Sequence, residues 1–161
     1  MTCPPTSFNW LGLLTAAVTI FGWFVVFRQS LILKSREDVR GLVDTAQSIV
    51  DEIYELSKKY YTDNDDHIGF ISSDIRSRFL LLSLYVSLIN KKNAKYDVEH
   101  YVIQYRKAIM GGFFETTEFK RQMEIPDRRA DISNFRSELH YHIEIMFVNW
   151  TKSIKWFERL H

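Results

Sequence analysis

The sequence predicts an all-α protein in which one N-terminal transmembrane helix precedes a cytoplasmic antiparallel helical bundle. Three observations predict it: an uncharged apolar run near the start, the lack of proline between Pro5 and Pro126, and apolar residues that recur every three to four positions. A length of 161 residues suits one domain. We expect an external N-terminus at residues 1–7, a transmembrane helix at residues 8–27 and the bundle at residues 28–161.

The apolar run is FNWLGLLTAAVTIFGWFVVF, at Phe8–Phe27. As a helix it is about 30 Å long, the thickness of a bilayer's hydrocarbon core. Trp10 and Trp23 lie near its two ends, where interfacial aromatic residues are common. A buried core helix and a cleaved signal peptide are the alternatives. The preceding MTCPPTS has no Lys or Arg and no clear small-residue cleavage site follows, so we expect the segment to be retained.

Basic residues follow the run and none precedes it. They are Arg28, Lys34, Arg36 and Arg40. Because positive charge near a span favours the cytoplasmic side, we expect the N-terminus outside and the rest of the chain inside. The lipid bilayer is thus the first expected partner.

Small residues gather on one side of this predicted span. They are Gly12, Thr15, Ala16, Thr19 and Gly22. Small side chains let helix backbones approach closely in lipid, and threonine hydroxyls can bond across helices or face water. Two interpretations stay open: an ordinary anchor, or a self-associating helix that lines a pore.

The remaining chain contains four amphipathic segments joined by short connections. The first has an apolar stripe from Val39 to Tyr60 and ends in the polar cluster Thr62–His67; it can continue directly from the membrane helix. The second begins near Ile68 or Ser73 and includes the apolar run Phe79–Ile89, which we expect to be buried.

The third segment carries apolar residues from Val98 to Ile109 and stops at Gly111-Gly112. The stretch Glu115–Ala130, which mixes charge with Pro126, is interpreted as a connection that can contain a short helix, and the last helix begins near Asp131 or Ser133. Four such helices with short connections predict an antiparallel bundle.

The composition excludes several classes of function. With 21 Lys and Arg against 20 Asp and Glu, the net charge of +1 argues against general nucleic-acid binding, and no DNA partner is expected. The single Cys3 excludes an internal disulfide framework and a cysteine-rich zinc site. The sequence contains no P-loop, dinucleotide-binding, nucleophile-elbow or HExxH motif.

The densest group of titratable residues lies in the last helix. It comprises Arg136, Glu138, His140, His142 and Glu144. His140 and His142 are two residues apart and point to different sides of a helix, so they make a poor metal site. No metal or cofactor is therefore expected.

The same segment, RSELHYH, holds an Arg and a His separated by five residues. An Arg/His pair can cleave RNA without a metal, because the His moves a proton and the Arg stabilises the charge on the phosphorane. The candidates are Arg136 and His142, with His140 as the competitor for the histidine role. A structural role, in which these residues hold the last helix against its neighbours, is the favoured alternative.

A membrane helix, an all-α body and a C-terminal Arg136…His142 element together resemble the small membrane-anchored accessory proteins of type VI-B CRISPR loci. The resemblance implies a divergent HEPN-like helical domain and a role in antiphage defence at the bacterial inner membrane. It also implies a homo-oligomer that opens a pore or perturbs the membrane, with an RNA-guided RNA-cleaving effector and its RNA as partners. The alternatives are a membrane-tethered HEPN-type ribonuclease and a non-catalytic, membrane-anchored interaction module.

Overall fold

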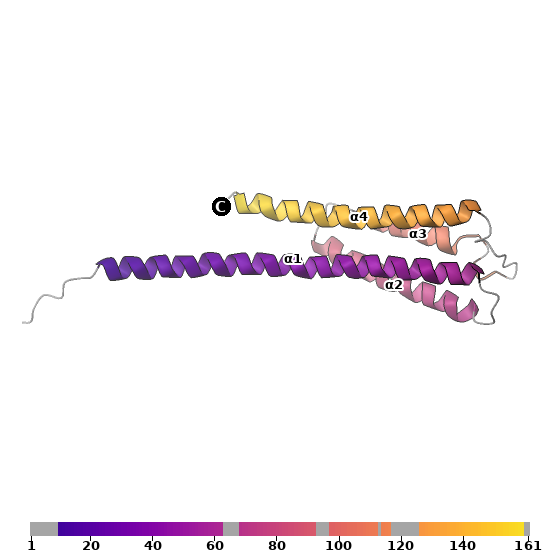
Figure 1. The fold of residues 1–161 in the computed structure, drawn as a ribbon, viewed down its shortest axis with the longest axis horizontal. Helices are drawn as coiled ribbons and strands as arrows, with labels where there is room; N and C mark the ends of the chain where they lie inside the picture. Colours follow the sequence, from indigo (N-terminus) through magenta and orange to yellow (C-terminus); the bar gives the residue numbers. More distant parts are fainter. Residues whose placement is uncertain (1–9, 63–67, 93–96, 113, 117–125, 160–161) are drawn as a thin grey trace, which may run out of the picture. The chain divides into compact units, whose positions relative to one another are not determined.

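The computed structural model describes residues 10–62, 68–92, 97–112, 114–116 and 126–159, and within them the chain is helical with no strand. Four helices follow one another: α1 (Trp10–Thr62), α2 (Ile68–Lys92), α3 (Glu99–Met110) and α4 (Pro126–Arg159) (Figure 1). The predicted all-α class and the helix count of the described chain are confirmed. The residues predicted to be external, 1–7, lie outside the described part.

The chain divides into two compact units, Met1–Asp38 and Val39–His161. In the first unit the side chains from Trp10 to Phe27 are all exposed. Among the described residues, α1 is the one helix long and apolar enough to cross a membrane. A core helix of a soluble protein would bury its apolar side chains, and none is buried in this stretch. The prediction of one long apolar N-terminal helix is therefore confirmed.

The second unit begins inside α1. From Val39 onward the helix buries a stripe with 3–4 spacing: Val39, Val43, Ala46, Ile49, Val50, Ile53, Ser57, Tyr60 and Tyr61. The one buried polar residue in this stripe, Ser57, satisfies its hydroxyl by donating to the Tyr54 carbonyl oxygen at 2.7 Å. The expected continuation of the apolar run into the next amphipathic segment is confirmed, because α1 has no interruption between residues 10 and 62.

Glycines end α3 where the sequence predicted. The Gly111 N–H donates to the Lys107 carbonyl oxygen at 2.9 Å, and a Cβ at Gly111 would lie 2.4 Å from that same oxygen. Only glycine fits this turn. Gly112 then takes a φ of 70°, a left-handed conformation that favours glycine.

The last helix starts earlier than the sequence indicated. We expected a connection up to Asp131 or Ser133, but α4 begins at Pro126. Proline suits the first position of a helix because its fixed φ is already helical and its missing N–H has no partner there anyway. The residue read as part of a connection is thus the helix start.

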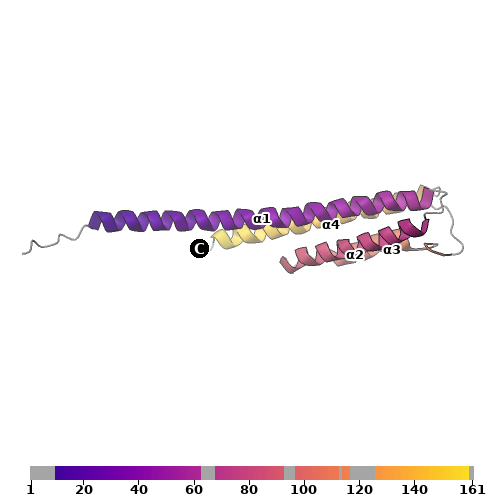
Figure 2. The same cartoon turned by 90° about the horizontal axis from the view of Figure 1, so that it is seen from below.

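The four helices run alternately up and down in the second unit (Figures 1 and 2). The core lies between them and takes residues from every helix. Its fully buried members outside α1 include Ile75, Leu82, Val86 and Ile89 from α2, Tyr105 and Ile109 from α3, and Ile132, Leu139, Ile143 and Met146 from α4. The expectation of a bundle core is met by this arrangement.

The run Phe79–Ile89 is not buried all round, contrary to our expectation. Phe79, Leu82, Val86 and Ile89 are in the core, whereas Leu80 and Leu84 are 71% and 55% exposed. The other helices enclose only one side of α2, and no described element covers its outer side. An apolar face is therefore left on the surface.

Candidate functional site

Two helices of the second unit meet through polar side chains. We call this contact the polar seam; its members are Arg40, Asp44, Gln47 and Asp51 on α1 and Arg136, His140 and Glu144 on α4. The α1 members have spacings of four, three and four residues, and the α4 members are four apart, so each set occupies one side of its helix. Arg40 contacts Glu144, whereas Asp51, further along α1, contacts the earlier α4 residue Arg136. This order is the one that antiparallel helices produce.

One end of the polar seam is centred on Arg40. Its guanidinium donates to both carboxylate oxygens of Glu144, at 2.7 and 3.0 Å, and its Nε lies 2.8 Å from Asp44. The guanidinium also lies over the ring of Phe147, 5.2 Å from its centroid. The hydrogen bond to Glu144 is the main cause that raises the pKa of Arg40 above its ordinary value.

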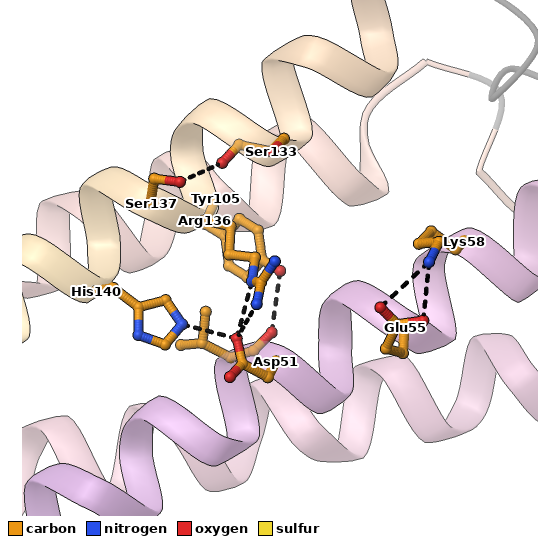
Figure 3. A network of polar contacts seen from close by, with 9 residues as sticks. Asp51, Glu55, Lys58, Tyr105, Ser133, Arg136, Ser137 and His140 are labelled. Carbon is orange, nitrogen blue, oxygen red and sulfur yellow. Dashed lines mark hydrogen bonds and ion pairs between the residues drawn. The ribbon is translucent and has the colours of Figure 1, made fainter.

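The other end is centred on Asp51 (Figure 3). A single carboxylate oxygen, Oδ1, is 2.8 Å from each of three nitrogens: Nε and Nη2 of Arg136, and Nε2 of His140. The guanidinium of Arg136 also lies 4.7 Å from the ring centroid of Tyr54. Asp51 thus holds two residues of α4, one turn apart, against α1.

These contacts shift the acidity of Asp51. Partial burial would raise the pKa of the carboxyl, but the hydrogen bonds from Arg136 and His140 outweigh it and the pKa is lowered from its ordinary value of 3.8. The charged form of Asp51 is therefore the form that the folded protein favours.

His142 lies on a different side of α4 from Arg136. Its ring stacks on Tyr101 of α3, with centroids 3.5 Å apart and an angle of 16° between the planes. Arg136 and His140 instead turn toward α1. The structure therefore brings Arg136 together with His140, and it places the two members of the Arg136…His142 element against different helices.

The contacts define what this arrangement can do chemically. In RNA cleavage the guanidinium has to face the phosphorane, whereas two of the three guanidinium nitrogens of Arg136 face Asp51. A charge already compensated by a carboxylate stabilises a developing anion less well. The geometry is that of a clamp between helices.

Two polar residues of α4 that are four positions apart both contact α1. His140 bonds to Asp51, and Glu144 bonds to Arg40 and lies 3.4 Å from Gln47. These partners belong to another helix, so the spacing of residues along α4 does not reveal them. No group of three or more metal-ligating side chains occurs among the residues that the structure describes.

The small-residue side of α1 satisfies its own hydroxyls. Thr15 donates to the carbonyl oxygens of Leu11 and Gly12, at 2.8 and 3.0 Å, and Thr19 donates to that of Thr15 at 2.8 Å. Bonds of this kind let a threonine lie in lipid without a second helix. Gly22 has no atom within 4 Å of where a Cβ would be, so nothing within the chain requires a glycine there.

A shallow, open depression on the surface of α1 is lined by Thr19, Gly22, Trp23 and Val26. Trp10 and Trp23, the predicted interfacial residues, are 72% and 73% exposed. Among the four basic residues that follow the apolar run, Arg40 is the one to which the described contacts give carboxylate partners; Arg28, Lys34 and Arg36 precede the second unit.

Asp51 and Tyr101 were not expected from the sequence as the contact partners of Arg136, His140 and His142. Asp51 lies on the polar flank of an amphipathic helix, where one acid looks like any other. The available signal was the matched spacing of polar residues on two helices, residues 40, 44, 47 and 51 against 136, 140 and 144. That signal becomes readable only once α1 and α4 are known to be antiparallel neighbours.

Comparison with known proteins does not assign the chain to a family. No family model, no curated protein and no solved structure matches this chain. The functional argument therefore depends on the chain's own residues and their geometry.

Proposed function

We propose that this chain is a membrane-anchored protein that acts through self-association in the bilayer, as a pore or a membrane-perturbing assembly. The observation that carries the proposal is the exposed apolar part of α1 with its small-residue side. Helices that associate in lipid use small residues for close approach, and the space around Gly22 is open.

Retention of the segment is supported by its continuity with the bundle. A cleaved signal sequence ends at a processing site, whereas α1 continues as helix to Thr62 and buries its later residues in the core. We propose a single span with the N-terminus outside and the bundle in the cytoplasm, on the charges of Arg28, Lys34 and Arg36.

The wider role that we propose comes from the resemblance to accessory proteins of type VI-B CRISPR loci, with their HEPN-like domain. It is antiphage defence at the bacterial inner membrane, in which the assembly enhances immunity by an RNA-guided RNA-cleaving effector. We do not include RNA cleavage by this chain in the proposal, because Arg136 is bonded to Asp51 and His142 is stacked on Tyr101.

Particle size in detergent, together with dye release from vesicles, tests the proposal. Gly12→Leu with Thr19→Leu fills the small-residue side and is expected to reduce both the particle size and the dye release. Ala17→Leu, the same kind of enlargement on the other side of α1, is the matched control and should change neither. A monomeric wild-type chain at micromolar concentration would contradict the proposal.

Immunity measured in cells tests the non-catalytic part separately. His142→Ala should retain protection against phage when the effector is present, and Arg136→Lys should do so as well because it keeps the charge beside Asp51. Circular dichroism of each variant checks that the bundle is intact. The ribonuclease alternative would be favoured if the wild-type chain cleaves RNA and if well-folded His142→Ala and Arg136→Lys variants both lose protection.

A further inference from the structure

An apolar surface on the second unit has no partner among the described residues. We call it the α2–α3 face; its members are Leu80, Leu84 and Leu88 of α2 and Glu99, Ile103 and Lys107 of α3. Leu80 is 71% exposed, Leu84 is 55% exposed and Ile103 is 51% exposed. Exposed leucines one turn apart are more typical of a contact surface than of a solvated helix.

The two helices form one continuous surface. A groove of about 270 Å³ between them is lined by Ser83 and Val86 of α2 and by Glu99, Val102 and Ile103 of α3. Ile103 borders this groove from α3, and Leu80, Leu84 and Leu88 are exposed on α2. From Phe79 to Ile89, α2 contains no charged residue.

Charges at the two ends of α3 have opposite signs. Asp97 and Glu99 lie exposed at its N-terminal end, and Arg106 and Lys107 lie exposed at its C-terminal end. These signs suit the helix dipole, and none of the four forms an ion pair within the described chain. Ile103 is equidistant from Glu99 and Lys107, four residues from each.

This pattern is complementary to itself. If a second α3 lies antiparallel with the two Ile103 side chains in contact, each Glu99 faces the other copy's Lys107 about 6 Å along the helix axis from the centre. A parallel arrangement would place Glu99 beside Glu99. A two-fold axis therefore joins opposite charges at the rim and apolar side chains in the middle, which is the make-up of an isologous interface.

We propose that the α2–α3 face binds the same face of a second copy of this chain across a two-fold axis beside Ile103. The inference deepens the proposed self-association, on which it rests, by adding a contact outside the membrane segment. A ring built from head-to-tail contacts alone would not bring the same residue of two copies together, so the two arrangements are distinguishable.

Disulfide cross-linking of the full chain in native membranes is the test. In a Cys3→Ser background, Ile103→Cys is expected to give a disulfide-linked dimer as the main product of mild oxidation. Tyr141→Cys on α4 is the matched control, since Tyr141 is 61% exposed and lies outside the face. Cross-linking at residue 103 no stronger than at residue 141 would overturn the proposal.

The charges are tested with two differently tagged chains. A Glu99→Cys chain should cross-link to a Lys107→Cys chain at least ten times more than to another Glu99→Cys chain. In the Ile103→Cys background, Glu99→Lys should weaken the dimer band, and Glu99→Lys with Lys107→Glu should restore it. Failure of the restored pair to recover the band would refute the antiparallel register.

Two further outcomes separate this proposal from its alternatives. If Gly12→Leu with Thr19→Leu leaves the large assembly and the dye release unchanged while the cross-link at residue 103 forms, the membrane-helix proposal fails and the α2–α3 face stands. If the double variant abolishes the large assembly but the wild-type assembly gives no cross-link at residue 103, the membrane-helix proposal stands and the face is refuted. If phosphatidylcholine vesicles protect Ile103→Cys from a water-soluble maleimide without any cross-link, the face binds lipid and the proposal is overturned.

Discussion

The bundle part of α1 is held by two kinds of contact, and they differ in almost every physical property. Toward α3 the contacts are dry: Tyr105 donates its hydroxyl to the Val50 carbonyl oxygen at 3.1 Å, and Tyr61 donates to that of Ile109, with both rings fully buried. Toward α4 the polar seam is half-exposed, and most of its members are charged. The dry contact provides stability, and the polar seam provides register.

The turn after α3 belongs to the dry contact. The ring of Tyr60 packs against that of Phe114, with centroids 4.7 Å apart and a tilt of 33°, and its hydroxyl accepts a hydrogen bond from the Glu115 backbone N–H at 2.9 Å. Burial raises the pKa of Tyr60 and places that of Tyr105 far above its ordinary value. Burial therefore favours the protonated form of both hydroxyls.

The largest expected effect comes from a cavity in the dry contact. Ile53→Ala removes a fully buried side chain from α1 and should lower the free energy of unfolding by about 2–5 kcal/mol. Chemical denaturation followed by circular dichroism measures it. Ser48→Ala, at an exposed position of the same helix, should change stability by less than about 0.5 kcal/mol. Equal effects at both positions would contradict the assigned core.

A smaller loss is expected from one buried hydroxyl. Tyr105→Phe keeps the ring in the core but removes the donor to Val50, at a cost of about 1 kcal/mol. Tyr141→Phe is the control, because that ring is exposed. The measurement is the denaturation midpoint, and the loss should be the same at low and high salt. A loss that disappears at high salt would place Tyr105 in a solvated environment instead.

The polar seam should show a weaker, salt-dependent coupling. A double-mutant cycle of Arg40→Gln and Glu144→Gln is expected to give about 0.2–1 kcal/mol, because both side chains are 41% exposed. Raising the ionic strength from about 0.05 M to about 1 M should remove most of this coupling. Coupling that is unchanged by salt would show that the pair is shielded from solvent.

The smallest effect is the pH dependence of the clamp at Asp51. Its pKa is lowered in the folded state, so its contribution is present above the ordinary carboxyl value of 3.8 and is lost as the pH falls through the lower, folded-state value. Asp51→Asn should therefore be less stable than the wild type near neutral pH, and the difference should vanish in acid. Denaturation midpoints of both proteins across this range provide the measurement. A difference that grows in acid would contradict the assignment.

The buried stripe of α1 was predictable from the sequence, and the polar seam was not. The 3–4 spacing of Val39, Val43, Ala46 and Val50 predicts a helix with one buried side, and Gly111 marks the end of the third helix by its chemistry. These signals are local. The clamp at Asp51 depends on which helix lies beside α1 and in which register, and periodicity along one chain carries no such information.

The apolar run in α2 is a second case in which the sequence did not predict the packing. An uncharged segment is typical of a buried helix, but burial depends on how many neighbours a helix has. In a unit of four helices, α2 buries Phe79 and Leu82 and leaves Leu80 on the surface. Composition indicated that this segment avoids water, and only the packing shows which of its sides remains uncovered.

The contribution of α4 to the core has a consequence for the order of synthesis. Ile132, Leu139, Ile143 and Met146 are fully buried, and they belong to the last of the four helices to leave the ribosome. The apolar stripe of α1 is made first, and the part of the core that α4 completes stays open until α4 emerges. We therefore expect a premature stop before residue 132 to yield an aggregating or degraded product.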